Sequence, residues 1–431
     1  MANEIFGARV SGDTRALAQA VVTNSSPEAT QGLRGRERVV LLVSLSLLSM
    51  LSPFATDMYL PSFPRMVQDL STTASGVQLT LTTFLIGVAL GQLTFGPLSD
   101  RYGRKPPLLV GSILCVVASV LAMLAPTIEV LLGARFFQGL GGAAGIVIAR
   151  AIVADVFRGT EAASIFSLLA VLGGLAPLTA PVLGGLLAGP IGWRGVLAVL
   201  AGLTVAMSLV AAFVIRETAP RRGIGAGSQA ASSPRAAHLG TILLRPGFTA
   251  YALVKTFGFM ALMGYIAASP FIFQEYIGVD ELGGAALFAL NSLALIVANA
   301  LNARLVRRHG PARMMRVGLL LLTTAAVALA LVVFLGAPPW ALIPTFVLLV
   351  GSMGLIFGNS IALAISHARD AAGSASAFIG FAQFVAGAAV APLVGVAGRI
   401  SPVPLTVVVV VATVGAWACA MVGARAPADP S

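Results

Sequence analysis

The sequence has few of the residues that form disulfides, metal sites or reactive centres. Its 431 residues include two cysteines and three histidines. Cys115 and Cys419 lie in apolar segments, and the histidines are scattered among the loops. This spacing fits neither a disulfide framework nor a metal site, so we expect no metal. Clustered His, Glu or Ser/Lys groups are also missing from the apolar segments, which argues against a membrane-embedded enzyme.

Charge is equally scarce. Charged residues make up 10% of the chain and hydrophobic residues 58%, whereas a soluble protein has about 25% charged residues. The apolar surface is therefore predicted to face lipid. The formal net charge is +11, but the arginines lie between apolar segments rather than on one face of a soluble domain. Nucleic acid is therefore not a predicted partner.

Twelve apolar stretches are long enough to cross a bilayer, since roughly 20 residues span its hydrocarbon core. They lie near 39–63, 76–98, 106–125, 128–150, 161–189, 195–215, 248–273, 283–305, 314–336, 340–363, 372–396 and 402–424. The pattern predicts an all-α integral membrane protein. We divide the chain into a disordered N-terminal tail (1–36), a six-helix bundle (37–216), a linker (217–247), a second six-helix bundle (248–424) and a C-terminal tail (425–431).

The distribution of Lys and Arg predicts the orientation of these spans. An even number of spans places both termini on one side of the membrane. That side carries 22 of the 27 Lys and Arg residues, and the loops of the other side carry three. By the positive-inside rule, both termini are predicted to be cytoplasmic.

One short loop between the second and third spans combines glycines with four charges. Its pattern is Gly-x-x-x-Asp-Arg-x-Gly-Arg-Lys, formed by Gly96, Asp100, Arg101, Gly103, Arg104 and Lys105. The short connection makes the flanking helices antiparallel neighbours. Its three cations place the loop at the cytoplasmic face.

The two halves of the chain repeat each other. Gly103 in this loop is echoed by Gly310 at an offset of 207 residues, and Pro181 is echoed by Pro392 at an offset of 211. The second copy has lost the acid, because Arg307 stands where Asp100 would be. Duplicated six-helix halves predict a binding site between them near the middle of the membrane.

Two ionisable residues within the first half are candidates for proton coupling. Asp57 lies in the first span and Arg135 in the fourth, and a charge inside a span suggests function. Their predicted depths allow a direct or water-bridged contact. The alternatives are a solvated acid at a helix end for Asp57, and a packing role on backbone carbonyls for Arg135. In the seventh span, Lys255 is expected to reach the membrane interface along its own stem, and the alternative is a charge that lines the cavity.

Small residues and prolines crowd the fifth span, at Gly173, Pro177, Pro181, Gly184 and Gly185. They predict either close helix packing or a hinge. Polar and aromatic residues of the spans are candidates for lining a substrate cavity: Tyr59, Phe84, Gln92, Gln138, Tyr265, Asn291 and Gln383.

Five segments together resemble the major facilitator superfamily, and within it the Bcr/CflA group of bacterial drug:proton antiporters. They are residues 56–64, 96–105, 135–139, 180–185 and 302–308. The resemblance implies twelve helices in two pseudo-symmetric six-helix bundles around a central cavity. It also implies a cytoplasmic latch that includes Asp100 and Arg101, proton coupling through Asp57 and Arg135, and an antiporter motif in the fifth helix. That motif usually reads Gly-Pro at its centre, where this chain has Ala180-Pro181.

The resemblance implies proton-driven export of small amphipathic drugs, such as bicyclomycin- or chloramphenicol-like antibiotics, across the bacterial inner membrane. The alternative is transport of a native metabolite. The expected partners are the lipid bilayer, the drug and protons. No cofactor is expected beyond the proton gradient as energy source, and the protein is expected to be a monomer.

Overall fold

The computed structural model describes residues 35–157, 159–218, 242–368, 372–396 and 401–426. Within these residues every regular element is a helix. The first half contains α2 (Gly35–Asp57), η1 (Leu60–Ser62), α3 (Phe63–Asp69), α4 (Ala74–Tyr102), α5 (Lys105–Leu124), α6 (Ile128–Val156) and α7 (Gly159–Phe213). The second half contains α9 (Pro246–Phe271), η2 (Ile272–Ile277), α10 (Glu281–His309), α11 (Pro311–Phe334), η3 (Pro339–Ala341), α12 (Leu342–Ser366), α13 (Ala372–Val390), η5 (Leu393–Gly395) and α14 (Val403–Arg425).

The described residues contain eleven apolar helical segments that are long enough to cross a membrane. One of them belongs to α7, which is 55 residues long and is interrupted at Gly192 by a non-helical backbone (φ 66°, ψ 177°). The positive φ favours glycine there. The two parts of α7 are separate spans, which gives twelve spans in all. The predicted all-α membrane fold with two six-helix halves is confirmed.

The duplication inferred from the sequence is visible in the helix boundaries. Each end of α10 lies 207 residues after the corresponding end of α4. Thr73 and Asp280 cap the two helices, and each side chain accepts a hydrogen bond from the backbone N–H three residues further on. The helices end at Gly103 (φ 89°) and Gly310 (φ 75°). The same caps and the same turn therefore recur in both halves.

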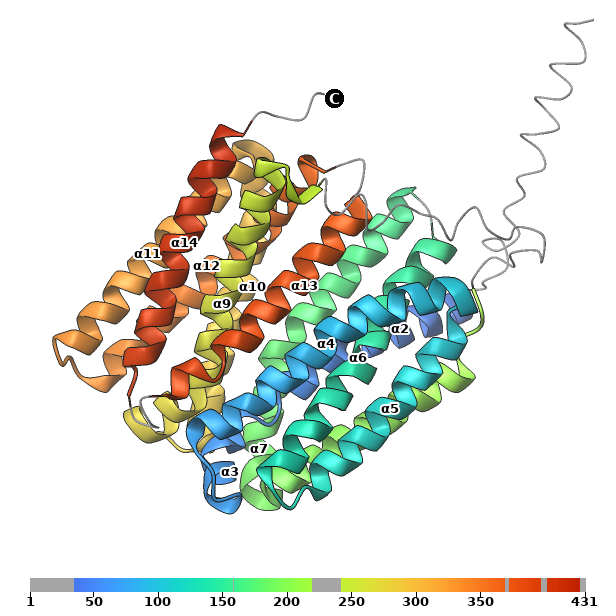
Figure 1. Ribbon diagram of the computed structural model, residues 1–431, viewed down its shortest axis with the longest axis horizontal. Coiled ribbons are helices and arrows are strands. Elements are labelled where there is room, and N and C mark those ends of the chain that lie inside the picture. The colour runs from blue at the N-terminus through green and yellow to red at the C-terminus, as the bar shows by residue number, and fades with distance from the viewer. Residues whose placement is uncertain (1–34, 158, 219–241, 369–371, 397–400, 427–431) are drawn as a thin grey trace, which may run out of the picture.

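The two halves meet along two pairs of helices. In Figure 1, α11 and α14 lie at one side of the molecule and α5 at the other, with α4, α7 and α13 between them. α4 of the first half packs on α13 of the second, and α7 packs on α10. α9 is the most enclosed candidate span, with 83% of its most apolar window buried. We call the end where α2 begins and α14 ends the termini face, and the other end the opposite face.

A set of polar contacts joins the halves on the side of the opposite face, and we call them the seam contacts. They are the hydrogen bonds Ser75–Pro392 (3.1 Å), Gln78–Ala267 (2.9 Å), Thr82–Ala388 (2.7 Å), Gln274–Pro61 (2.7 Å) and Ser292–Pro177 (3.0 Å), with an Arg65–Glu281 ion pair (3.6 Å). In five of these contacts a side chain donates to a backbone carbonyl of the other half. The halves are therefore fastened together between the opposite face and the middle of the bundle.

Candidate substrate and proton site

Asp57 lies at the point where the first transmembrane helix is broken. α2 contains Pro53 and ends at Asp57, and Pro61 follows in the short helix η1. Proline lacks a backbone N–H and disrupts the regular helix ladder. Asp57 is nevertheless only 4% exposed, so it is not the solvated helix-end acid that the sequence left open. Among the described residues its carboxylate has no ion pair and no hydrogen bond.

A polar pair of the second half lies near this carboxylate. Asn291 of α10 donates a hydrogen bond of 2.7 Å to the hydroxyl of Tyr265 in α9. The Tyr265 hydroxyl is close enough to Asp57 for a Coulombic interaction. The side-chain oxygen of Asn291 is buried and has no partner among the described residues. A buried carboxylate of one half therefore lies within Coulombic range of a buried polar pair of the other half, and this pair keeps one unsatisfied oxygen.

Aromatic rings surround the Tyr265 side of this site. The Tyr265 ring is stacked on Phe288 at a centroid distance of 5.7 Å and lies 5.3 Å from the ring of Phe346. Tyr265 and Asn291 are 1% and 2% exposed. The pair is thus held rigidly in an apolar environment, where unsatisfied polar atoms are costly and bind a matching group well.

Arg135 is fully buried within the first half. Its guanidinium donates a 2.8 Å hydrogen bond to the carbonyl of Ala55 and a second, short one to Gln138. It also lies between the rings of Tyr59 and Phe84, at 4.4 Å from each centroid. Each desolvated cation–π contact is worth about 2 kcal/mol.

Close packing of α4 on α6 sets this arrangement. A β-carbon on Gly87 would lie 2.1 Å from the carbonyl oxygen of Phe136, and one on Gly139 would lie 2.1 Å from that of Phe84. Only glycine permits the backbones to approach so closely. This approach brings Phe84 onto the guanidinium of Arg135.

The predicted contact between Asp57 and Arg135 is not present as an ion pair among the described residues. Arg135 instead binds the carbonyl of Ala55, two residues before Asp57. This arrangement matches the alternative interpretation, in which Arg135 holds a backbone carbonyl and packs the helices. Arg135 therefore fixes the end of α2 that carries Asp57, and any part it has in coupling remains a prediction.

The other predicted cavity residues divide into three groups. Gln138 donates 2.8 Å to Ser119 of α5 and lies inside the first half rather than between the halves. Tyr59 and Phe84 pack on Arg135. Gln92 and Gln383 are half-buried. Tyr59 and Tyr265 lie within Coulombic range of Asp57, and Asn291 is hydrogen-bonded to Tyr265.

The glycines and prolines of the fifth span lie where the halves meet. A β-carbon on Gly184 would lie 1.8 Å from the carbonyl oxygen of Met58, and one on Gly185 would lie 2.6 Å from the β-carbon of Ala285. The carbonyl of Pro177 accepts the seam contact from Ser292. Gly173 and Pro181 lie in the same helix, α7. This part of α7 touches both the break after α2 and helix α10 of the other half.

The position of the Lys255 side chain differs from the one predicted. It is 6% exposed and does not extend to the interface. Its ammonium lies 3.2 Å from the centroid of the Phe357 ring and 5.5 Å from that of Phe259. The rings of α9 and α12 hold the side chain inside the bundle, because the ammonium gains cation–π energy there.

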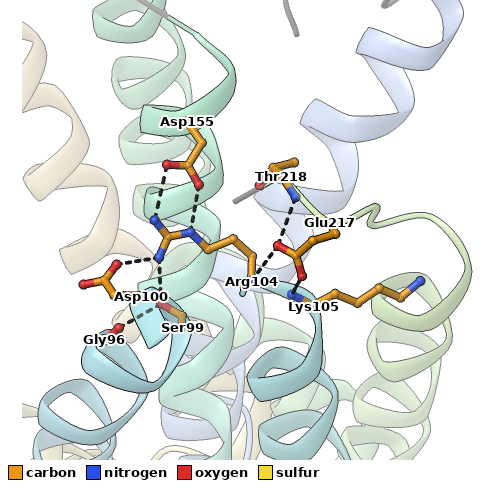
Figure 2. A network of polar contacts seen from close by, with 8 residues as sticks. All are labelled: Gly96, Ser99, Asp100, Arg104, Lys105, Asp155, Glu217 and Thr218. Atoms are coloured by element: carbon orange, nitrogen blue, oxygen red, sulfur yellow. Dashed lines mark hydrogen bonds and ion pairs between the residues drawn. The ribbon is translucent and has the colours of Figure 1, made fainter. Parts of the chain in front are cut away.

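At the termini face, Arg104 binds two acids (Figure 2). It donates to Asp155 of α6 through Nε (2.7 Å) and a terminal nitrogen (3.2 Å), and to Asp100 of α4 at 2.7 Å. Glu217 accepts hydrogen bonds from the backbone N–H groups of Arg104 and Lys105, at 2.7 and 3.1 Å. Burial opposes the charged form, but the hydrogen bonds and charges of Asp155 and Asp100 outweigh it and raise the pKa of Arg104. We call these residues the Arg104 cluster.

The cluster brings together two residues of the predicted latch loop, Asp100 and Arg104, whereas a latch role for Arg101 stays a prediction. Arg101 makes no ion pair among the described residues, and its guanidinium lies 5.3 Å from the ring of Tyr102. The reason is the turn at Gly103, whose φ of 89° directs the following residue back toward α4 and α6. A β-carbon on Gly103 would also lie 2.6 Å from the carboxylate of Glu217.

Two residues of this cluster, Asp155 and Glu217, were not predicted from the sequence. Each is an acid that directly follows an apolar stretch at the arginine-rich face. Acids are scarce at that face, and an acid among many arginines is expected to form an ion pair. This scarcity could have identified both residues from the sequence. The pairing itself depends on the helix arrangement.

Two related six-helix halves with buried charges near their meeting surface are the architecture of a secondary transporter. The sequence profile of the Major Facilitator Superfamily matches residues 45–392. The chain belongs to this superfamily, and it is a transporter rather than an enzyme.

Similar proteins agree with this assignment. The chain is 34% identical to the uncharacterized MFS-type transporter YdgK of Bacillus subtilis, over 89% of this chain and 95% of the relative. It is 29% identical to a bicyclomycin resistance protein homolog of Haemophilus influenzae, over 82% and 88% of the two chains. It is 34% identical to a chloramphenicol resistance protein of Pseudomonas aeruginosa, over 76% and 75%. The predicted resemblance to the drug-resistance group is confirmed.

Solved structures share the fold. A bacterial homolog of the human lysosomal transporter Spinster superposes with a TM-score of 0.73 at 16% identity, covering 93% of this chain and 100% of the other. A D-xylose-proton symporter gives 0.71 at 14% identity, with 88% and 97% covered.

Proposed function

We propose that this transporter exports small amphipathic drugs in exchange for protons, across the bacterial inner membrane and with both termini in the cytoplasm. The orientation follows from the excess of Lys and Arg at the termini face. Relatives named for bicyclomycin, chloramphenicol and multidrug resistance support the substrate class.

The observation that carries the proposal is the free carboxylate of Asp57. It is buried and lacks a cation among the described residues, and Tyr265 of the other half, which accepts a hydrogen bond from Asn291, lies within Coulombic range of it. A carboxylate in this position has two forms of different charge. The charged form costs several kcal/mol in an apolar environment unless it is paired, so protonation changes how the two halves fit together.

In an alternating-access mechanism, the change in the charge of Asp57 can drive drug movement in one direction across the membrane. The seam contacts join the halves near the opposite face, so we infer that a substrate enters between the halves from the termini face. A proton and a drug are exchanged when each favours a different arrangement, because a ligand bound equally in both shifts nothing. Protonation of Asp57 from the outer side and release inside then accompany outward movement of the drug.

A susceptibility panel tests this function. The chain and its Asp57→Asn variant are expressed in a bacterium that lacks its main efflux pumps, with membrane insertion checked by immunoblotting. We expect the unmodified chain to raise the inhibitory concentration of one or more amphipathic antibiotics and Asp57→Asn to return it to the vector value. No protection against any drug in the panel would favour the alternative, transport of a native metabolite.

A further inference from the structure

The second half contains a buried ammonium without an acidic partner, that of Lys255. Lys255 is 6% exposed, and within the part of the chain that the structure describes two aromatic rings contact its charge. Among the described residues no carboxylate forms an ion pair with it and no atom accepts a hydrogen bond from it. Three charged residues of the described chain are buried, Asp57, Arg135 and Lys255, so cations outnumber acids inside the membrane-spanning part.

The contacts of the Lys255 ammonium do not compensate for the free energy that it loses by leaving water. Removing an ammonium from water costs several kcal/mol even after the protein relaxes. A desolvated cation–π contact returns about 2 kcal/mol. Phe357 is in close contact and Phe259 is more distant, so the rings do not replace the lost hydration. The site is therefore suited to a negative group that arrives from outside the chain.

The site lies on helices of the second half that also carry seam contacts. Lys255 and Phe259 are four residues apart on α9, so they share one face. Ala267, further along α9, accepts the seam contact from Gln78 of the first half. On α13, Phe384 and Ala388 are likewise four residues apart, and Ala388 accepts the seam contact from Thr82.

Lys255 lies beyond the seam contacts toward the termini face. It is 12 residues before Ala267 on α9, which is about 18 Å along the helix. It is nine residues after Pro246, where α9 begins, or about 14 Å from the termini face. Lys255 therefore lies about a third of the way along α9 from the termini face.

Half-buried rings form the rest of the site. Phe259 contacts Phe384 edge to face at 5.6 Å and Phe357 at 6.4 Å. Each of the three rings keeps part of its surface exposed. An aromatic molecule can pack on these rings while its negative group reaches the ammonium next to them.

We propose that Lys255, with Phe259, Phe357 and Phe384, binds the anionic group of aromatic organic anions as substrates. The proposal rests on the proposed export function and narrows its substrate class. The carboxylate of the substrate pairs with the ammonium, and the aromatic body packs on the three rings. Asp57 lies in the other half and stays available for the proton.

A matched pair of probes tests the site on the purified full-length protein. 1-Naphthoate and 1-naphthamide have the same ring and nearly the same shape, and only the first is an anion. Their dissociation constants are measured by calorimetry in detergent at pH 7.5. The variants are Lys255→Gln, Lys255→Arg and, as a control, Arg316→Gln, which removes an exposed cation of the same half.

We expect the unmodified protein to bind naphthoate roughly tenfold or more tightly than naphthamide, since a charged hydrogen bond is worth at least this factor. In Lys255→Gln the preference for naphthoate over naphthamide should fall to less than about threefold. The affinity for naphthamide should not change, because the substitution removes only an electrostatic interaction with the anion. Lys255→Arg should keep a preference for the anion, and Arg316→Gln should match the unmodified protein. Equal affinity for both probes in the unmodified protein, or an unchanged preference in Lys255→Gln, would overturn the proposal.

A transport measurement separates this proposal from the export function. A neutral drug to which the chain confers resistance should still be exported by Lys255→Gln. Loss of neutral-drug export in this variant would assign Lys255 to coupling or folding and contradict the proposal. Failure of the unmodified chain to export any drug would contradict the proposed function alone, because the probe affinities do not depend on export.

Discussion

Gly184 lies directly against the backbone of Met58, and a β-carbon on the glycine would come within 1.8 Å of the Met58 carbonyl oxygen. Met58 follows Asp57, and the next glycine, Gly185, packs on Ala285 of the other half. The glycine-rich part of α7 is thus wedged between the proposed proton site and the partner half. A movement of α7 against α10 therefore also displaces the backbone next to Asp57.

Gly184→Ala should therefore destabilise the protein and reduce export. A β-carbon cannot be accommodated without moving α7 or the end of α2, and such overpacking costs about 1–3 kcal/mol. Thermal unfolding in detergent should show a lower midpoint. Gly202→Ala is the matched control, because Gly202 lies in the part of α7 beyond Gly192 and a β-carbon there meets nothing within 4 Å. Equal stability of the two variants would contradict the close contact.

Arg104 and Arg101 should respond differently to the same substitution. Arg104→Lys replaces a guanidinium that binds Asp155 through two nitrogens and Asp100 through one, and a single ammonium does not reproduce this geometry. We expect export to fall severalfold. Arg101→Lys should stay near the unmodified level, because Arg101 is exposed. A larger loss of export in Arg101→Lys than in Arg104→Lys would instead support a latch role for Arg101.

Loss of Arg135 should act mainly on stability. Arg135→Met would leave the Ala55 carbonyl and the Gln138 side chain without their donor, and each unsatisfied buried polar group costs about 1–3 kcal/mol. We expect a markedly lower unfolding midpoint and loss of export together. A stable Arg135→Met protein that binds drug but does not respond to a pH gradient would instead place Arg135 in coupling.

The seam contacts should control which face is open. Thr82→Val removes the hydroxyl that donates to Ala388 while keeping the shape of the side chain. Weakening this contact should favour opening at the opposite face, so a cysteine placed at Ser75 should react faster with a polar maleimide in the Thr82→Val background. Thr324→Val is a suitable control, because the Thr324 hydroxyl bonds within its own helix. Identical rates in both backgrounds would show that the contact does not hold the seam.

The sequence predicted the fold well because membrane spans are encoded locally, as long apolar stretches separated by charged loops. The repeat was also readable, since Gly103 and Gly310 mark the same turn in each half. The break in α7 at Gly192 was also predicted, because it falls between the expected spans 161–189 and 195–215. The predicted division at 217–247 falls partly on residues 219–241, outside the described residues.

Side-chain partners were harder to predict, because they depend on helix rotation and tilt. Arg104 rather than Arg101 binds the acids since the Gly103 turn reverses the direction of the chain. Lys255 is buried because Phe357, about 100 residues later in the chain, lies beside it. Asp57 and Arg135 were rightly placed at similar depth, but Arg135 binds the backbone of Ala55 instead.

The central claim is that Asp57 carries the proton that drives export. The most direct measurement uses proteoliposomes containing the unmodified protein or Asp57→Asn, with a radiolabelled drug identified by the panel. Drug movement is measured under a pH gradient, and drug–drug exchange is measured without one. Asparagine keeps the shape of the side chain but cannot titrate, so the account predicts no gradient-driven movement in Asp57→Asn while exchange continues. Gradient-driven movement at the unmodified rate would show that another group carries the proton.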